Sequence, residues 1–270
     1  MKRRMRLFII CMVIGALFSG CGTIAGNLED NDNTAKNGDT DINYNTDTYV
    51  FKAEVMEAGD TLLVAPDPDS QEYKSSDRIA VNLLDCIIKD AEGKEITEEE
   101  LRVGDIIEIT YGGMIAESYP AQLTATAVQV KDHNLLIDGY FAIIDDIWQQ
   151  DAGLNSDIKV IGVDTSEWTG LTEMEKEIVL AGLKERYGYD IAEGTSEELA
   201  EQGLIDKENL YFPEGVLIVI SDMNYDKEKS KITYAIMKWR SGDGAIGSDN
   251  CTAQYDGTKW EIKYENQWIS

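Results

Sequence analysis

The sequence predicts a mostly β protein with two folded parts. These are a small five-stranded barrel over residues 48–132 and an α+β domain, a helix-covered antiparallel sheet, over residues 135–270. Two observations predict this. In the first part, short strand-like runs at regular spacing are separated by turn clusters, which is typical of a small barrel or sandwich. In the second part, helical periodicity comes first and consecutive strands follow, which is typical of an α+β arrangement.

The chain opens with the pattern of an exported protein. Basic residues are followed by the uncharged apolar run Leu7–Phe18 and then by Ser19, Gly20 and Cys21. A membrane-spanning helix needs roughly 20 apolar residues, so this shorter run predicts a cleaved signal peptide over residues 1–20. An ordinary secretory signal with an incidental cysteine is the alternative.

The end of this leader refines the prediction. The segment 17–21, Leu-Phe-Ser-Gly-Cys, resembles the lipobox of bacterial lipoproteins. That resemblance implies lipidation of the Cys21 thiol by diacylglycerol. It also implies a protein anchored to the outer face of the cell membrane, as in Gram-positive bacteria. Residues 21–47 are polar and almost free of apolar side chains, so they predict a disordered linker.

The charge of the chain restricts its partners. It has 51 acidic and 24 basic residues and a formal net charge of −27. Such a surface repels the phosphates of nucleic acids, so no nucleic-acid partner is expected. It also repels anionic lipid headgroups, so the acyl chain is expected to supply the membrane attachment.

Few residues are suited to bind a metal or form a disulfide. The single histidine, His133, argues against a multi-histidine metal site and is predicted to lie in a surface loop. The acidic runs at 30–33 and 222–228 lack the glycine and glutamate that a calcium loop requires at fixed places. Cys86 and Cys251 are predicted to be small buried side chains without a disulfide. No metal or cofactor is expected.

Strands are predicted throughout the first part. A Thr97–Glu100 capping box also predicts one short helical turn before Gly104. The expected strands are Tyr49–Val55, Thr61–Val64, Ile79–Leu84, Ile106–Tyr111 and Leu123–Val130. A barrel of this size with five main strands suits an OB-like, partly open barrel.

Three short motifs carry a resemblance to a known family. They are Leu101-x-x-Gly104-Asp105, Ile109-x-Tyr111-x-Gly113 and Ser118-Tyr119-Pro120-Ala121-Gln122. Residues 48–131 resemble the YobA-type domain of unknown function, found in small secreted proteins of Gram-positive bacteria. The resemblance implies an OB-like barrel and no known activity.

Ser118 and Tyr119 are candidate ligand-binding residues, because OB-like barrels bind ligands on loops and one sheet face. In the structural alternative, Pro120 imposes an extended bend and Tyr119 covers the barrel end.

The second part begins with an apolar stripe at helical spacing along residues 136–151. A strand at Ile158–Asp164 follows. Capping boxes at Thr172–Glu175 and Thr195–Glu198 start two further helices, which stop at Gly188 and Gly203. The later strands are expected at Val216–Ser221, Lys231–Arg240, Ala245–Tyr255 and Lys259–Tyr264.

The layout of this part resembles the cone-shaped folds of the nuclear transport factor 2 (cystatin-like) kind. The opening helix, the strand meander and the tail Asp256–Ile262 with Trp268–Ser270 carry the resemblance. Such folds include enzymes and many binding modules, so the fold alone does not choose a function.

A glycine-rich stretch, residues 239–247, supplies a second pair of candidate ligand-binding residues, Trp239 and Arg240. Arg240 is a fixed cation that could hold an anionic ligand group at a lip. The structural alternative is a glycine-rich hairpin with Arg240 paired to a nearby carboxylate such as Asp243 or Asp249.

The sequence has no nucleophile elbow, phosphate loop or zinc-ligand spacing. We therefore expect a membrane-anchored, non-enzymatic binding or regulatory module whose partner is an envelope protein or glycan. The alternative is a carboxylate-dependent hydrolase of envelope glycans, because some of the many acidic side chains could work as an acid–base pair. A third hypothesis is an inhibitory module for an envelope protein. Carboxylates facing one pocket would favour the enzyme, and an apolar or aromatic groove would favour a binder.

Overall fold

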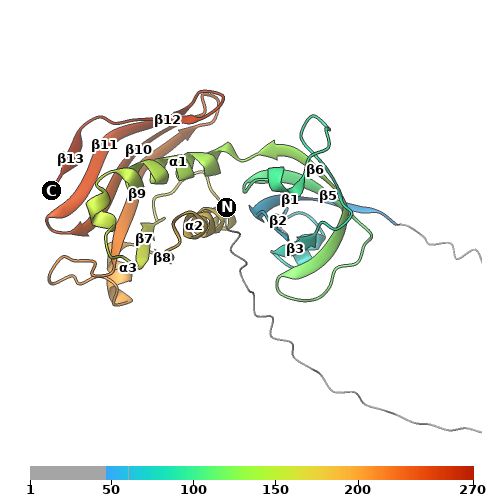
Figure 1. The fold of residues 1–270 in the computed structure, drawn as a ribbon, viewed down its shortest axis with the longest axis horizontal. Coiled ribbons are helices and arrows are strands. Elements are labelled where there is room, and N and C mark those ends of the chain that lie inside the picture. Colours follow the sequence, from blue (N-terminus) through green and yellow to red (C-terminus); the bar gives the residue numbers. More distant parts are fainter. Residues whose placement is uncertain (1–46, 60) are drawn as a thin grey trace, which may run out of the picture. The chain divides into compact units, whose positions relative to one another are not determined.

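The structure is a computed structural model that describes residues 47–59 and 61–270, all within one compact unit from Asn45 to Ser270. The predicted signal peptide (1–20), Cys21 and the predicted linker (21–47) lie outside the described residues, except for the last linker residue. Within the described ranges, no helix is long and apolar enough to cross a membrane. Two sheets follow one another along this part of the chain (Figure 1).

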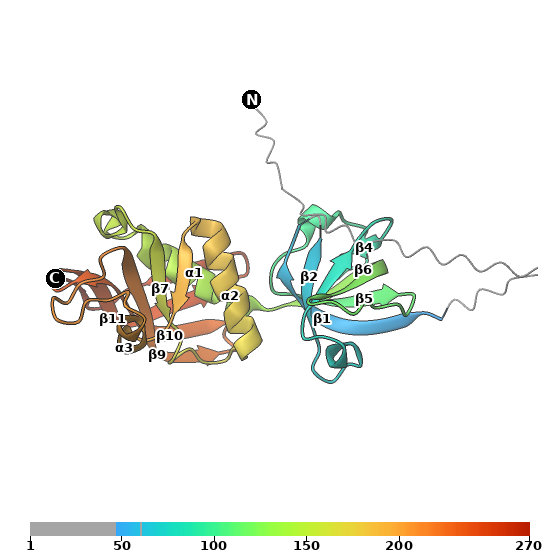
Figure 2. The ribbon, with the colours of Figure 1, turned by 90° about the horizontal axis from the view of Figure 1, so that it is seen from below.

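The first sheet curls into a closed barrel (Figure 2). Its strands are β1 (Tyr49–Glu57), β2 (Leu62–Pro66), β3 (Ile79–Asn82), β4 (Ile87–Lys89), β5 (Asp105–Tyr111) and β6 (Ala121–His133). Antiparallel pairs join β3 to β2, β2 to β1, β1 to β5 and β5 to β6, and a parallel β3–β6 pair closes the ring. Strand β4 is an extra strand beside β6. The barrel prediction is confirmed, and the arrangement is consistent with an OB-like fold.

Apolar residues at every second position of the strands fill the barrel, because successive side chains of a strand point to opposite faces. On β5, Ile107, Ile109 and Tyr111 are buried and their neighbours are only half-buried. The half-buried thiol of Cys86 packs against this core, while Cys251 is buried in the core of the second sheet. Both cysteines are free, so the prediction of unbridged side chains is confirmed.

The second sheet is mixed and packs against helices. Its helices are α1 (Leu135–Gln149), α2 (Glu173–Tyr187) and α3 (Ser196–Glu201). Its strands are β7 (Val160–Asp164), β8 (Asp190–Glu193), β9 (Gly215–Asp226), β10 (Lys231–Ser241), β11 (Gly244–Tyr255), β12 (Trp260–Lys263) and β13 (Gln267–Ile269). Antiparallel pairs connect β9, β10, β11 and β12, as predicted. The short strand β13, which was not predicted, pairs antiparallel with β11. Strand β7 pairs in parallel with both β8 and β9.

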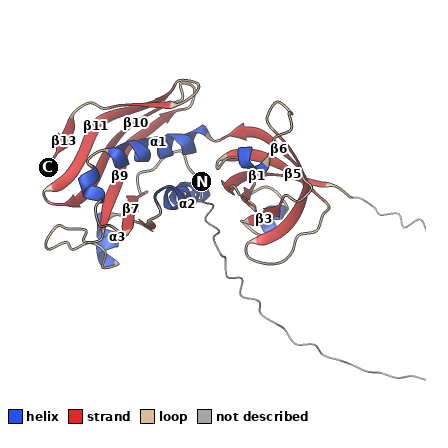
Figure 3. Cartoon of the chain, viewed as in Figure 1, coloured by secondary structure: helices blue, strands red, loops and turns tan. Residues whose placement is uncertain are grey.

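Helix α1 lies along the inner side of the curved strands β9–β13 (Figure 3). The predicted apolar stripe faces the sheet and holds the helix there, and its residues Ile137, Phe141, Ile144 and Ile147 are all buried. The helix comes very close to the sheet at Gly139, where an added Cβ would lie 2.6 Å from the Ile232 side chain. Any larger residue at this position would have to push the Ile232 side chain aside.

The barrel and the second sheet share apolar contacts. Met56 of β1 belongs to the buried core of the second sheet, and Leu63, Ala65 and Val103 pack against that core. An ion pair between Arg78 and Glu177 joins the barrel to α2. Strand β6 passes into α1 through Asn134 alone, so the end of the barrel and the start of the helix lie next to each other. We call this region the junction.

Candidate functional site

The outer surface of β3 and β6 forms a shallow groove beside the loop that connects β5 to β6. The parallel register places Ala80 beside Gln122 and Asn82 beside Thr124. Gln122, Thr124 and Thr126 alternate with buried residues, so they point outward from β6. The groove has a volume of about 770 Å³. We call it the barrel groove.

The lining of the barrel groove is uncharged. Its described lining residues include no Asp, Glu, Lys or Arg, although the chain carries a net charge of −27. The polar groups that face it are threonine hydroxyls and the amides of Asn82 and Gln122. Such groups both donate and accept hydrogen bonds without charge, so the groove suits a neutral polar ligand.

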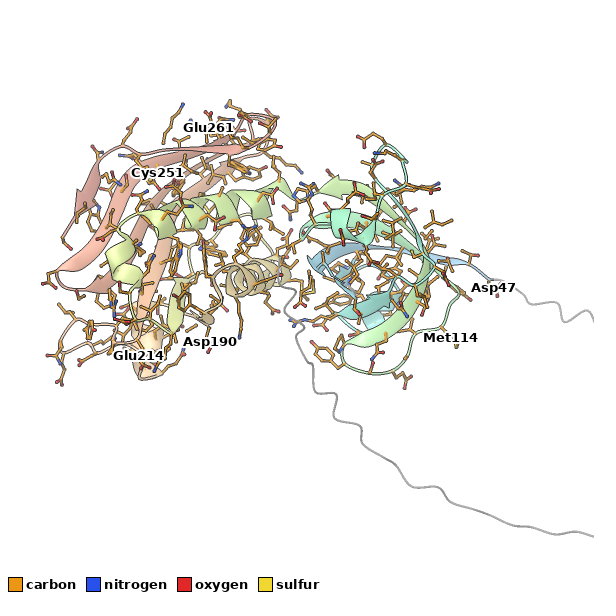
Figure 4. The ribbon with its side chains drawn as sticks, viewed as in Figure 1. Asp47, Met114, Asp190, Glu214, Cys251 and Glu261 are labelled. Carbon is orange, nitrogen blue, oxygen red and sulfur yellow. The ribbon has the colours of Figure 1, made fainter. Side chains whose placement is uncertain are left out.

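The β5–β6 loop carries exposed apolar side chains, and one of them, Met114, lines this groove. Met114, which lines it, is 86% exposed, and Tyr119 is 70% exposed. Met114 projects from the barrel in Figure 4. Ser118 Oγ donates to the carbonyl of Pro120 and accepts a hydrogen bond from the Gln122 side chain at 3.3 Å. These contacts place Ser118 at the groove, and the exposure of Tyr119 shows that its ring does not cover the barrel end.

The other predicted ligand-binding pair lies on the other sheet. Trp239 packs against the small apolar cluster that contains Phe212. The Arg240 guanidinium donates to the backbone carbonyls of Leu154 at 3.0 Å, Ser156 at 2.5 Å and Pro213 at 3.4 Å. The structure therefore does not bring the two predicted pairs together. These contacts are structural, with carbonyls in place of the carboxylate partner expected from the sequence.

Substitution of Arg240 separates the two roles considered for it. We expect Arg240→Ala to lower the free energy of unfolding by about 1–3 kcal/mol, because three carbonyls lose a donor. Urea unfolding measures this, with Lys263→Ala at an exposed position of the same sheet as the control. An unchanged stability together with lost ligand binding would instead support the predicted ligand role.

A polar cluster that the sequence pattern does not predict occupies the junction. His133 Nδ1 lies 2.8 Å from Asp105 Oδ1, and Nε2 lies 2.8 Å from Asp138 Oδ2. The histidine side chain is only 16% exposed, so its predicted place in a surface loop is wrong. Burial alone would lower the pKa of His133, but the hydrogen bonds to both aspartates outweigh it and raise the pKa to about 9.

A second part of the cluster centres on Asn134. Its side-chain amide donates to Glu54 at 3.0 Å and to Glu175 at 2.5 Å. Burial raises the pKa of Glu54 to about 7, against the hydrogen bond from Asn134, and the negative charge of Glu175 adds to the rise. An adjoining cleft of about 530 Å³ is lined by His133, Asn134 and Glu175, among others. Among the described residues, no group of three or more potential ligand side chains could hold a metal ion.

Carboxylates also meet at the ends of β7 and β8, around a pocket of about 600 Å³. The three carboxylates nearest the strand ends each accept a hydrogen bond, two of them from their own loop and Glu193 from the loop after β7. Asp164 accepts from Ser166, Glu193 accepts from Thr165, and Glu198 accepts from Thr195 in a capping box. The backbone hydrogen bond from Thr195 lowers the pKa of Glu198. A general acid needs a raised pKa, so Glu198 is not suited to that role.

Comparison with known protein families finds no family model that matches this chain, and comparison with curated proteins finds no match.

Proposed function

We propose that this chain is a non-enzymatic binding module that uses the barrel groove to hold an uncharged ligand, an envelope glycan or a neutral peptide segment. The observation that carries the proposal is the uncharged lining on a strongly acidic chain. Hydroxyl and amide groups along β3 and β6 would bond a polar chain, and Met114 and Tyr119 would contact its apolar faces. A ligand of this kind gains hydrogen bonds there without the cost of bringing a negative charge near many carboxylates.

The setting of this module is part of the same proposal. A lipid on Cys21 would hold the chain at the outer face of the membrane, and residues 22–46 would connect the anchor to the folded part. OB-like barrels bind ligands on one sheet face and its neighbouring loops, and this supports the groove by analogy of fold alone. The resemblance to the YobA-type domain and to cystatin-like folds is compatible with a binding module and implies no particular activity.

A charge placed in the groove tests the proposal. We expect Thr124→Glu to weaken binding to purified, insoluble envelope glycan at least tenfold. A bound neutral chain would cover the new carboxylate and leave some of its oxygens without a hydrogen-bond donor. Co-sedimentation of the purified protein with the glycan measures this. The matched control is Thr124→Gln, which has the same size and no charge and should keep most of the binding. Equal binding by the two variants would remove the groove from the proposal.

The same assay addresses the alternative of a carboxylate-dependent hydrolase. An enzyme would release soluble sugar fragments from the glycan over time, whereas a binding module would leave the pellet intact. If wild-type protein neither binds the glycan nor cleaves it, the occupant of the groove is expected to be a neutral segment of an envelope protein. Crosslinking on intact cells would then identify that protein.

A further inference from the structure

The junction joins the barrel to α2 through one shared amide. Glu54 comes from β1 and Glu175 from the first turn of α2, and both accept from the side-chain amide of Asn134. Two carboxyl groups on one amide nitrogen lie close together. Two negative charges at such a distance repel each other strongly in a partly buried site.

We propose that a proton on the Glu54–Glu175 pair controls how tightly the first turn of α2 is held on the barrel. With the proton bound, one neutral carboxyl group and one carboxylate share the amide and the contact is closed. Without the proton, the two carboxylates repel each other and the first turn of α2 moves away from the end of β1.

The second carboxyl oxygen of Glu175 explains why the effect would reach the helix. It accepts from the backbone nitrogen of Thr172, and the Glu175 nitrogen donates to Thr172 Oγ1 at 3.2 Å. These two bonds form the capping box that starts α2. One side chain thus serves both the barrel contact and the helix cap, so displacing Glu175 would loosen the cap as well.

The imidazole of His133 does not change its charge in the same pH range. His133 faces Glu54 from β6 and remains protonated near neutral pH, because its pKa is about 9. Its two ring nitrogens are occupied by Asp105 of β5 and Asp138 of α1. The Arg102 side chain lies 3.6 Å from Asp105. Glu54, with its pKa raised to about 7, is therefore the group that titrates near neutrality.

Apolar packing limits the size of the movement. Met56, Leu63, Ala65 and Val103 remain packed against the core of the second sheet, and none of these side chains titrates. The ion pair between Arg78 and Glu177 also remains. We therefore expect a local opening at the first turn of α2 while the barrel and the second sheet stay in contact.

Hydrogen exchange of the full chain at pH 5.5 and pH 8.5, corrected for the intrinsic effect of pH, measures this opening. We expect the amides of Glu175 and Lys176, which both donate to Thr172, to exchange at least tenfold faster at pH 8.5. The reason is that each unit by which the folded-state pKa of Glu54 exceeds its ordinary value changes the equilibrium about tenfold. Amides in the centre of β5 should show no such change.

Two variants make the test specific. Glu54→Gln keeps an acceptor for Asn134 and cannot ionise, so exchange at Glu175 and Lys176 should stay slow at both pH values. Glu175→Gln removes the repulsion by neutralising the other carboxylate, so exchange should again stay slow at both pH values. This second variant keeps the test usable if Glu54→Gln does not fold. The control is Glu57→Gln, an exposed position of the same strand, which should keep the wild-type pH dependence. Equal wild-type protection at both pH values, or an unchanged pH dependence in both junction variants, would overturn the proposal.

Discussion

Replacement of Lys238 by methionine is expected to lower the free energy of unfolding by about 2–4 kcal/mol. Lys238 comes from β10 and is completely buried. Its ammonium group donates to the carbonyls of Trp148, Gln150 and Asp151 and to the side chain of Asn155. Burial lowers the pKa of Lys238 to about 8, partly offset by Asp151, so the group stays mostly protonated at pH 7. It thereby satisfies the carbonyls that α1 leaves unpaired at its C-terminal end.

Methionine fills nearly the same volume but donates no hydrogen bond, so these acceptors lose their partner. Methionine also removes the cost of burying a charge, which offsets part of this loss. The expected loss of unfolding free energy is therefore smaller than the summed contributions of the four hydrogen bonds. Guanidinium unfolding measures the difference, with Lys263→Met at an exposed position of β12 as the control. That control should change stability by less than about 0.5 kcal/mol. A Lys238→Met protein as stable as the control would show that water satisfies the end of α1 equally well.

The local structure of this chain follows closely from its sequence pattern. Alternating apolar residues mark β5, and the apolar stripe marks α1, because both periodicities report one buried face. The capping boxes at Thr172–Glu175 and Thr195–Glu198 start α2 and α3 where predicted. Such features depend on neighbours in the sequence, so they can be identified without knowing the rest of the fold.

Strand pairing follows much less directly from the sequence pattern. The parallel β3–β6 pair and the parallel strands β7, β8 and β9 were not predicted, because pairing direction depends on how the chain crosses between strands. Strand β8 was missed altogether, since it is short and flanked by Gly188 and Thr195, which had been assigned to helix ends.

The candidate sites depend on this pairing, so the sequence predicted them only in part. The barrel groove exists because β3 and β6 lie side by side, and Ser118, which its motif predicts as a binding residue, bonds to Gln122 in the groove lining. The junction exists because the β5–β6 register places Asp105 opposite His133. Nothing near His133 in the sequence indicates that an aspartate from a distant strand will face it. Arg240 shows the converse, since its glycine-rich surroundings correctly indicated a hairpin.

Replacement of His133 by glutamine is expected to have the second large effect, and this effect should depend on pH. The folded-state pKa of His133, about 9, lies above its ordinary value of 6.5. A raised folded-state pKa means that the folded protein binds the proton more tightly than the unfolded chain does. The stabilisation from His133 is therefore complete below pH 6.5 and is lost as the pH rises to about 9. Its size is about 3 kcal/mol, from 1.36 kcal/mol for each pKa unit.

Urea unfolding of wild type and His133→Gln at pH 6 and pH 9.5 measures this. The difference in unfolding free energy should shrink by about 3 kcal/mol between the two pH values. Asp138→Asn is the informative control, because it removes one of the two carboxylates that hold the imidazolium and should reduce the pH effect without abolishing it. A difference that is the same at both pH values would show that His133 contributes packing alone.

The same variant connects this prediction to the opening proposed for the junction. The positive charge of His133 lowers the pKa of Glu54, so its removal should raise that pKa further. The pH midpoint for exchange at the first turn of α2 should then move upward in His133→Gln. Wild-type protein is expected to lose the Glu54 proton first, near pH 7, and the His133 proton second, near pH 9. An unchanged midpoint in the variant would mean that the two groups titrate independently and that only the Glu54–Glu175 pair acts on α2.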